Sequence, residues 1–289
     1  MTRLPVRGMG GARRRPSRRR ASARLSPRRA LAALVMVGAG AATWGVAASP
    51  AFGVRSVDVS GAVVTTSAEV DAVLALGSPP PNSFTLATDA LRSGLDAIPS
   101  IAGAEVHVIL PGTLRVRIVE RTPILAWRVG AALLLVDRDG NVFADAGSAD
   151  ATAAARAIAA GLPTVDDLRA TGAPVGGVAT DVGTLPAVGG QVGPIELDVA
   201  TRLLSLRPAD IGSSAAALEV QLDDQDGWTV RPAVAASWTA VFGFYSPTLR
   251  PADLVPQQVR LLRSLLAGRE AHLLRIILAD GMHGTYTTR

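Results

Sequence analysis

The sequence has 289 residues and a formal net charge of +5, but the charge is divided unevenly along the chain. Residues 1–29 contain eleven of the 29 basic residues and no acidic residue, whereas residues 30–289 contain 18 arginines and 24 acidic residues, a net charge of −6. This distribution argues against a nucleic-acid-binding domain, which needs a basic face on its folded part, and the absence of cysteine excludes disulfides and thiol catalysis.

An uncharged segment, residues 30–48 (ALAALVMVGAGAATWGVAA), directly follows the arginine-rich tail. As a helix these 19 residues span roughly 28 Å at ~1.5 Å per residue, close to the ~30 Å hydrocarbon core of a bilayer. Because arginine-rich flanks stay in the cytoplasm, the pattern predicts a cytoplasmic tail (1–29) and a single transmembrane helix (30–48). The remaining residues then form extracytoplasmic domains with a type II topology.

A cleaved signal peptide is the alternative interpretation of the same segment. Ser49-Pro50-Ala51 forms a weak small-residue cleavage site. The apolar run is longer than the 7–15 residues typical of a signal peptide, which favours an uncleaved anchor. The Arg28-Arg29 pair sits in SPRRALA, a poor match to a twin-arginine export signal.

Residues 52–121 are predicted to form a small domain with the order strand–helix–helix–strand–strand. Alternating valines predict a strand over Phe52–Ser60, and Thr66-x-x-Glu69 is a capping box that begins the first helix. Thr88 is expected to cap the second helix, whose apolar stripe ends before Pro99. Two runs of alternating residues flank a Pro111-Gly112 turn and predict the last two strands: Val106, Val108 and Leu110, then Leu114, Val116 and Ile118.

Residues 122–289 are predicted to form a larger mixed β domain with flanking helices, so the whole chain is of the α+β class. Asp139-Gly140-Asn141 and Asp223–Gly227 indicate hairpin turns. Residues 146–194 are rich in Ala, Gly, Thr, Val and Pro and predict a loose loop, with a helix near Ala151–Ala159. Helices are expected around Glu196–Leu206 and Leu254–Leu266, and strands at Trp127–Val129, Ala132–Asp137, Asn141–Ala144, Leu218–Leu222, Trp228–Arg231, Ser237–Phe242, Leu273–Leu278 and Gly284–Thr288.

No catalytic motif is present in the sequence: it contains no H-E-x-x-H, no G-x-S-x-G and no phosphate-binding loop. His107 alternates outward on a strand, His272 is interpreted as structural at a helix end, and His283 lies in a C-terminal loop. The acidic turn Asp223–Asp226 lacks the glycine and distal glutamate of an EF-hand and is interpreted as solvated. We therefore expect no catalytic residue, no metal site and no cofactor.

Several motifs carry a resemblance to a known family. They are VRSVDVSG (54–61), LDAIPSI (95–101), AEVHVILPGTL (104–114) and VRIVERTPI (116–124), followed by Trp127 and LVDRDGNVF (135–143). With the basic tail and the single anchor, they resemble the FtsQ/DivIB bacterial cell-division proteins, whose strand–helix–helix–strand–strand module is the POTRA domain. The resemblance covers residues 30–145 and continues more weakly to the C-terminus.

The resemblance implies a non-catalytic scaffold at the division septum of the bacterial plasma membrane. Members link FtsB/DivIC-like and FtsL-like coiled-coil proteins to the septal peptidoglycan synthase complex, and the FtsB-type partner docks beside the last strands. Here that region maps to residues 280–288, with Tyr286 as the aromatic anchor, although residues 276–279 (IILA) are more apolar than expected. The candidate partner-binding residues are Asp280, Gly284, Thr285, Tyr286 and Thr287.

Strand edges give an independent reason to expect a binding protein, because an exposed edge invites a partner strand. Arg117 and Arg121 are candidates for a second contact, with a partner or the membrane surface. Two alternatives belong to other classes. A POTRA-bearing envelope assembly factor needs a barrel of many ~10-residue alternating strands, and a secreted cell-wall enzyme needs paired carboxylates or a metal site; the sequence provides neither pattern.

Overall fold

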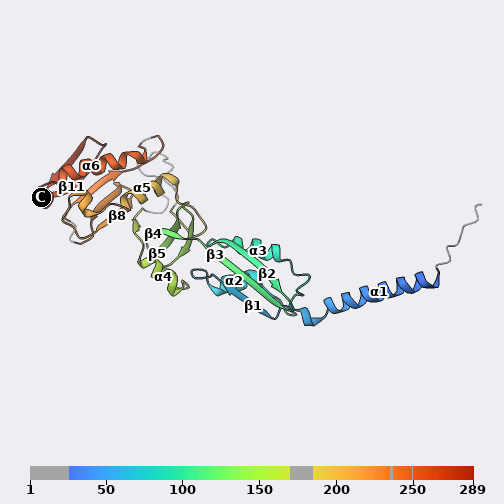
Figure 1. Cartoon of the computed structure of the whole chain (residues 1–289). Coiled ribbons are helices and arrows are strands. Elements are labelled where there is room, and N and C mark those ends of the chain that lie inside the picture. Colours follow the sequence, from blue (N-terminus) through green and yellow to red (C-terminus); the bar gives the residue numbers. More distant parts are fainter. Residues whose placement is uncertain (1–25, 170–184, 235–236, 249) are drawn as a thin grey trace, which may run out of the picture. The chain divides into compact units, whose positions relative to one another are not determined.

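The computed structural model describes residues 26–169, 185–234, 237–248 and 250–289, and the chain divides into two compact units, Met1–Ser49 and Pro50–Arg289. In the first unit the described residues form helix α1 (Pro27–Ala47; Figure 1). None of its side chains is buried. Its 21 residues extend about 31 Å, the thickness of a bilayer's hydrocarbon core. The helix is long and apolar enough to cross a membrane and is a candidate transmembrane helix, as predicted.

The second unit begins with a three-stranded domain, in which two helices cover one face of a small sheet. Its strands have the order β1-β3-β2, with β1 parallel and β2 antiparallel to β3. Leu95, Leu114 and Val116 are fully buried between the helices and the sheet. The predicted element order is confirmed: β1 (Ser56–Ser60), α2 (Ser67–Leu74), α3 (Thr88–Asp96), β2 (Ile101–Ile109) and β3 (Thr113–Glu120).

Two local predictions in this domain need correction. Strand β1 begins at Ser56 rather than Phe52, because residues 52–54 pair with the loop after α2, where the Val54 N–H donates to the Pro81 carbonyl at 3.0 Å. The capping box of Thr66 and Glu69 is confirmed at the start of α2. Thr88 is not a cap: it is the first residue of α3, and the cap position is held by Ala87, which has no side-chain acceptor.

A nine-stranded mixed sheet forms the rest of the second unit, with the order β12-β11-β10-β9-β8-β7-β4-β5-β6. Helices α5 (Pro194–Leu204) and α6 (Val255–Leu266) cover one face around a core that includes Trp127 and Leu134. Helix α4 (Ala153–Ala160) packs with Leu135, which points to the opposite face. The strands are β4 (Pro123–Val129), β5 (Ala132–Asp137), β6 (Val142–Asp145), β7 (Thr164–Asp167), β8 (Leu218–Asp223), β9 (Gly227–Pro232), β10 (Thr239–Gly243), β11 (Leu273–Leu278) and β12 (Gly284–Thr288).

The α+β class is thus confirmed, but the loose loop predicted for residues 146–194 is wrong in part. It contains α4, as expected near residues 151–159, and also β7, which no pattern indicated. Strand β7 joins the two halves of the sheet, because it pairs in parallel with β4 on one side and β8 on the other. It escaped prediction because it has only four residues, Thr-Val-Asp-Asp. Residues 170–184 of the predicted loop lie outside the described residues.

Asp167, the last residue of β7, lies in a buried cluster of charged side chains. The Asp167 carboxylate accepts hydrogen bonds from Trp127 Nε1 at 2.9 Å and from Arg169 Nη2 at 2.6 Å. Arg169 Nη1 also donates to Glu196 on α5 at 2.9 Å. The side chains of Asp167 and Arg169 are 0% and 4% exposed, and burial raises the pKa of Glu196 despite the nearby guanidinium. The cluster ties β7 to β4 and α5.

Replacing Arg169 by methionine is expected to lower the free energy of unfolding by about 3–5 kcal/mol, since it leaves the buried Asp167 and the partly buried Glu196 without their cation. Arg202→Met is the matched control, because Arg202 lies on the surface of α5 and pairs with the exposed Asp253; its loss should cost less than about 1 kcal/mol. Thermal unfolding of the full chain in detergent micelles, followed by circular dichroism, measures both. Equal losses for the two variants would contradict the role assigned to the cluster.

Candidate partner-binding site

Strand β12 is an unpaired edge of the nine-stranded sheet. It lies at one end of the strand order and, among the described residues, pairs only with β11, antiparallel, from Gly284 opposite Leu278 to Thr288 opposite Leu273. All five of its residues are exposed. Alternate N–H and C=O groups of such a strand point away from the sheet and are free to pair with another chain.

The packing of β11 against α6 positions this edge. Ile276 and Leu278 of β11 are buried with Leu262 and Leu266 of α6. At Gly284 a Cβ atom would lie 3.1 Å from the Ile277 carbonyl oxygen and within 3.4 Å of leucine side chains of α6. A glycine at the first position of β12 therefore allows the strand to approach the helix closely.

The turn between β11 and β12 is held by Asp280. Its carboxylate accepts hydrogen bonds from the backbone N–H groups of Met282 at 2.7 Å and His283 at 2.6 Å, and it contacts His283 Nδ1 at 2.8 Å. These bonds, the Met282 N–H first, lower the pKa of Asp280 to about 2. Asp280 is thus occupied within its own turn and fixes where β12 begins.

The side chains of β12 give the edge two different faces. Tyr286 lies opposite the buried Ile276 and is 45% exposed, and the guanidinium carbon of Arg269 is 5.9 Å from its ring centroid. Thr285 and Thr287 point to the other face of the sheet, where Thr285 lies opposite the 41% exposed Ile277. A partner strand on this edge would meet an aromatic ring on one face and threonines on the other.

Glu270 supports the same region from just before β11, in the short 3-10 helix η5 (Glu270–His272). Its carboxylate accepts hydrogen bonds from the Ser213 hydroxyl, from the N–H and hydroxyl of Ser214 and from Trp238 Nε1. Burial acts to raise the pKa of Glu270, but these donors outweigh it and lower the pKa to about 2. The carboxylate therefore joins residues 213–214 and Trp238 to the start of β11.

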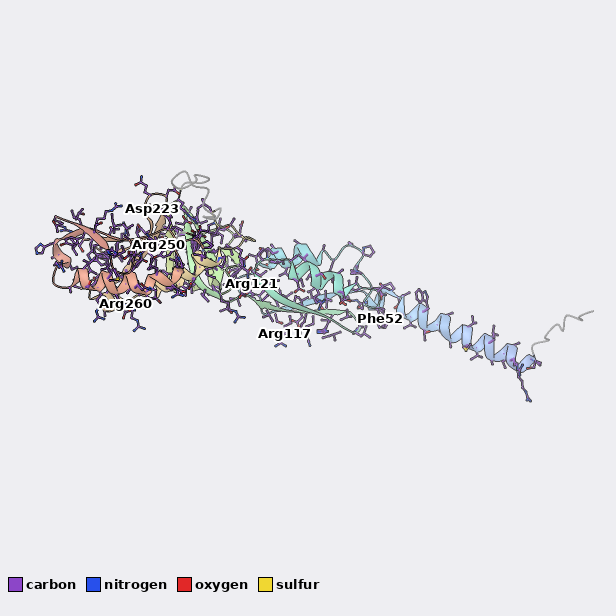
Figure 2. The ribbon with its side chains drawn as sticks, turned by 90° about the horizontal axis from the view of Figure 1, so that it is seen from above. Phe52, Arg117, Arg121, Asp223, Arg250 and Arg260 are labelled. Carbon is purple, nitrogen blue, oxygen red and sulfur yellow. The ribbon has the colours of Figure 1, made fainter. Side chains whose placement is uncertain are left out.

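The two predicted arginines are not part of this edge. Arg117 is exposed on β3, the central strand of the three-stranded sheet, between Ser60 and Glu105 (Figure 2). Arg121 follows β3; its Nη1 donates to Asp137 at 2.9 Å and its Nε donates to the Pro99 carbonyl at 3.0 Å. The structure thus brings residues 280–287 together and leaves Arg117 and Arg121 elsewhere, with Arg121 bound to groups of its own chain.

Sequence reasoning missed a junction between the two sheets. The Glu120 carboxylate accepts hydrogen bonds from the N–H groups of Val64 and Thr65 at 2.7–3.0 Å. Burial acts to raise the pKa of Glu120, but the Thr65 hydroxyl and these amides hold it below its ordinary value. Val64 is buried among Leu135, Phe143 and residues of α4. The only signal in the sequence was the charged Glu120-Arg121 pair where the chain leaves the first domain.

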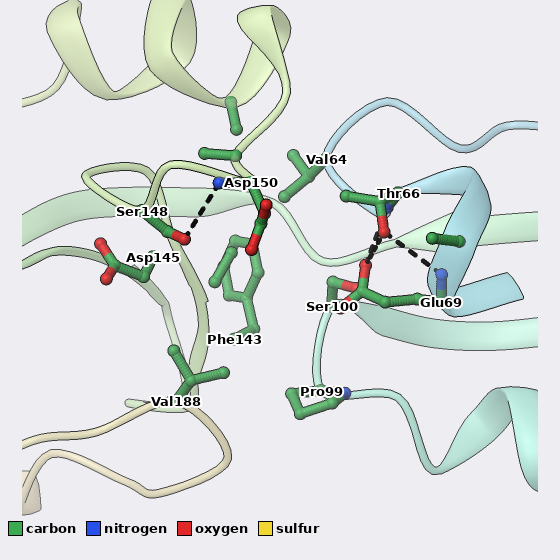
Figure 3. A pocket seen from close by; sticks show the side chains of 14 residues that line it. Val64, Thr66, Glu69, Pro99, Ser100, Phe143, Asp145, Ser148, Asp150 and Val188 are labelled. Carbon is green, nitrogen blue, oxygen red and sulfur yellow. Dashed lines mark hydrogen bonds between the residues drawn. The ribbon is translucent and has the colours of Figure 1, made fainter. Parts of the chain in front are cut away.

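A cavity of about 410 Å³ lies beside this junction, with Val64, Phe143 and Pro99 among its lining residues (Figure 3). Two carboxylates on its rim are engaged locally. Glu69 accepts from the Thr66 N–H and hydroxyl, and Asp145 accepts from two backbone N–H groups. The rest of the lining combines apolar side chains with a third carboxylate, Asp150.

In the part of the chain that the structure describes, no group of three or more His, Asp or Glu side chains is placed to hold a metal ion. The three histidines are exposed, in agreement with the prediction for His107. The acidic turn is closed internally: Asp223 accepts from two N–H groups of the turn, and Asp226 pairs with Arg275.

Comparisons with known proteins identify the first domain. Residues 52–121 match the family model described as "POTRA domain, FtsQ-type". Proteins named Cell division protein FtsQ are similar: the Cereibacter sphaeroides protein is 39% identical over 92 residues (32% of this chain, 30% of the relative), that of Jannaschia sp. 37% over 104 (36% and 33%), and that of Mycobacteroides abscessus 36% over 117 (40% and 36%). The chain thus spans about a third of each relative. The three-stranded domain is an FtsQ-type POTRA domain, as its motifs predicted.

Replacing Glu270 by glutamine is expected to destabilise the protein at neutral pH by about 1–2 kcal/mol, because a charged acceptor of several hydrogen bonds is lost. The folded-state pKa of about 2 lies below the ordinary value of 4.5, so the carboxylate stabilises the fold above pH 4.5 and loses this effect as the pH falls toward 2.

The difference in unfolding free energy between the natural protein and the Glu270→Gln variant should therefore be constant near neutrality and shrink between about pH 4.5 and 2. Denaturant unfolding at several pH values measures it, with Glu105→Gln, an exposed carboxylate on β2, as the control. A difference that does not depend on pH would show that the Glu270 hydrogen bonds do not operate as described.

Proposed function

We propose that this protein is a non-catalytic, single-pass membrane scaffold of the bacterial division machinery. The observation that carries the proposal is the combination of an FtsQ-type POTRA domain with a second sheet that ends in an unpaired strand. The similar proteins named Cell division protein FtsQ support the division role. A protein that works by presenting strand edges needs no catalytic group.

The proposed topology follows from charge and from α1. The eleven arginines of residues 1–29 remain in the cytoplasm, α1 crosses the plasma membrane, and residues 50–289 face the extracytoplasmic side. Each arginine near an anionic lipid surface adds about 1 kcal/mol of attraction, so the tail also holds the protein at the inner leaflet. Within this membrane the protein gathers at the division septum.

The proposed partner site is the β12 edge, and binding occurs by strand addition. An FtsB/DivIC-like partner extends the sheet through hydrogen bonds to the outward-facing backbone groups of the segment Thr285–Thr287, and the Tyr286 ring packs against an apolar partner side chain. Asp280 and Gly284 act as positioning residues, since one closes the turn and the other allows the close approach of β12 to α6.

The same assembly would include an FtsL-like partner and, through it, the septal peptidoglycan synthase complex. Arg117 is proposed as an accessory contact, because it is exposed and a guanidinium can pair with a carboxylate of a partner. Arg121 is proposed to act indirectly, by holding Pro99 and Asp137 at the junction between the sheets.

Proline scanning of the edge tests the proposed site. Neighbouring residues of a strand direct their N–H groups to opposite sides of the strand. Only one of the two substitutions Thr285→Pro and Tyr286→Pro therefore removes a hydrogen-bond donor that faces away from the sheet. We expect that variant to weaken binding of an FtsB-like partner at least tenfold while the unfolding temperature stays within a few degrees. Val57→Pro, on the β1 edge of the POTRA sheet, is the matched control. Unchanged affinity in both β12 variants would refute the site.

Imaging tests the proposed role in the cell. A copy with an N-terminal fluorescent tag, viewed in dividing cells and checked for size by blotting, should be full length and collect as a band at the division plane. A shortened product would instead support a cleaved signal peptide. A full-length product spread evenly over the envelope would argue against a division scaffold.

A further inference from the structure

One end of the POTRA domain gathers three chain segments that we call the POTRA tip: residues 50–55, 78–86 and 109–113. Backbone hydrogen bonds hold them together. Gly53 and Asn82 form an isolated antiparallel β-bridge. The Ser83 N–H donates to the Phe52 carbonyl at 2.8 Å, and the Arg55 N–H donates to the Gly112 carbonyl at 2.8 Å. The tip is thus a defined part of the domain, built around the first residues after α1.

Several large apolar side chains of the tip are exposed to solvent. Phe84 is 54% exposed, Leu110 52% and Ile109 37%. The Phe84 ring packs on Phe52, labelled in Figure 2, with their centroids 5.0 Å apart, so the two aromatic rings form one surface. Pro79, Pro80 and Pro111 are exposed beside them.

The tip also lacks the acidic side chains found elsewhere on the domain. Its three segments contain no Asp or Glu and a single basic residue, Arg55, whose Nη2 donates to the Pro50 carbonyl at 3.2 Å. Exposed carboxylates such as Asp58, Asp71 and Glu105 lie outside these segments. An apolar surface without carboxylates suits the headgroup layer of a bilayer that contains anionic lipids.

Covalent connection limits how far the tip can be from the membrane. Three peptide units join Ala47, the last residue of α1, to Pro50, and they span at most about 11 Å when fully extended. The headgroup layer is roughly 5–8 Å deep on each side of the hydrocarbon core. If α1 spans the core, Pro50 lies within this layer or just outside it.

We propose that the POTRA tip is a second membrane contact, in which Phe84, Phe52 and Leu110 insert into the headgroup layer of the outer leaflet. Aromatic side chains are favoured at this depth, and a second contact beside the anchor restricts how the POTRA domain swings about residues 48–49. The proposal rests on membrane anchoring by α1, and the lipid bilayer is the single occupant to which it commits.

The natural absence of cysteine makes a direct test possible. The full chain is reconstituted in phosphatidylcholine–phosphatidylglycerol vesicles as single-cysteine variants that carry a nitroxide label. Phe84→Cys and Leu110→Cys probe the tip, and Ala102→Cys is the matched control at the far end of β2, about 26 Å from Leu110 along the strand. Val35→Cys, in the middle of α1, reports whether the anchor is in lipid.

Power-saturation electron paramagnetic resonance compares collisions with oxygen, which concentrates in lipid, and with a water-soluble nickel chelate. We expect the oxygen-to-nickel ratio at positions 84 and 110 to exceed that at 102 by at least threefold. If positions 84 and 110 match position 102 while position 35 is in lipid, the tip proposal is overturned and the anchor stands. If position 35 is also aqueous, the anchor proposal itself fails.

Discussion

The second unit depends on one carboxylate, that of Glu120, at the point where the chain leaves the POTRA sheet. By accepting hydrogen bonds from the N–H groups of Val64 and Thr65, it fixes the loop between β1 and α2. This loop then buries Val64 among Leu135 and Phe143 of the second sheet. The hydrogen bonds to Glu120 and the burial of Val64 support each other, because the carboxylate holds the loop that places Val64 in the neighbouring apolar cluster. Two sheets with separate cores thereby become one compact unit.

The same use of carboxylates recurs throughout the protein. Side chains that accept hydrogen bonds from backbone N–H groups close loops, caps and turns at Glu69, Glu120, Asp137, Asp145, Glu270 and Asp280. Such bonds favour the ionised form, and at Glu120, Glu270 and Asp280 they lower the pKa. At these three positions the acidic side chains therefore contribute to the fold in their ionised form.

Patterns with a repeating period were predictable from the sequence, and isolated long-range contacts were not. The alternation of Leu114, Val116 and Ile118 predicted β3, and the capping box predicted the start of α2. Strand β7 could not be predicted, because its four residues include Asp167, which is buried only through Arg169, Trp127 and the neighbouring strands. At the candidate site, turn and strand residues 280–288 were predicted in sequence, but the engagement of Arg121 with Asp137 depends on a junction that no local pattern encodes.

The form of the β12 edge sets the strength of binding that it can support. Five residues offer only two or three outward-facing positions, and each net hydrogen bond contributes about 0.5–1.5 kcal/mol. A short, threonine-rich edge with one aromatic ring therefore avoids indiscriminate pairing, but on its own it holds a partner strand weakly. A membrane-anchored partner changes this balance, because confinement beside the same bilayer raises its effective concentration. In the proposed function, anchoring by α1 and recognition by β12 are thus complementary: the edge selects the partner, and the membrane makes a modest affinity sufficient.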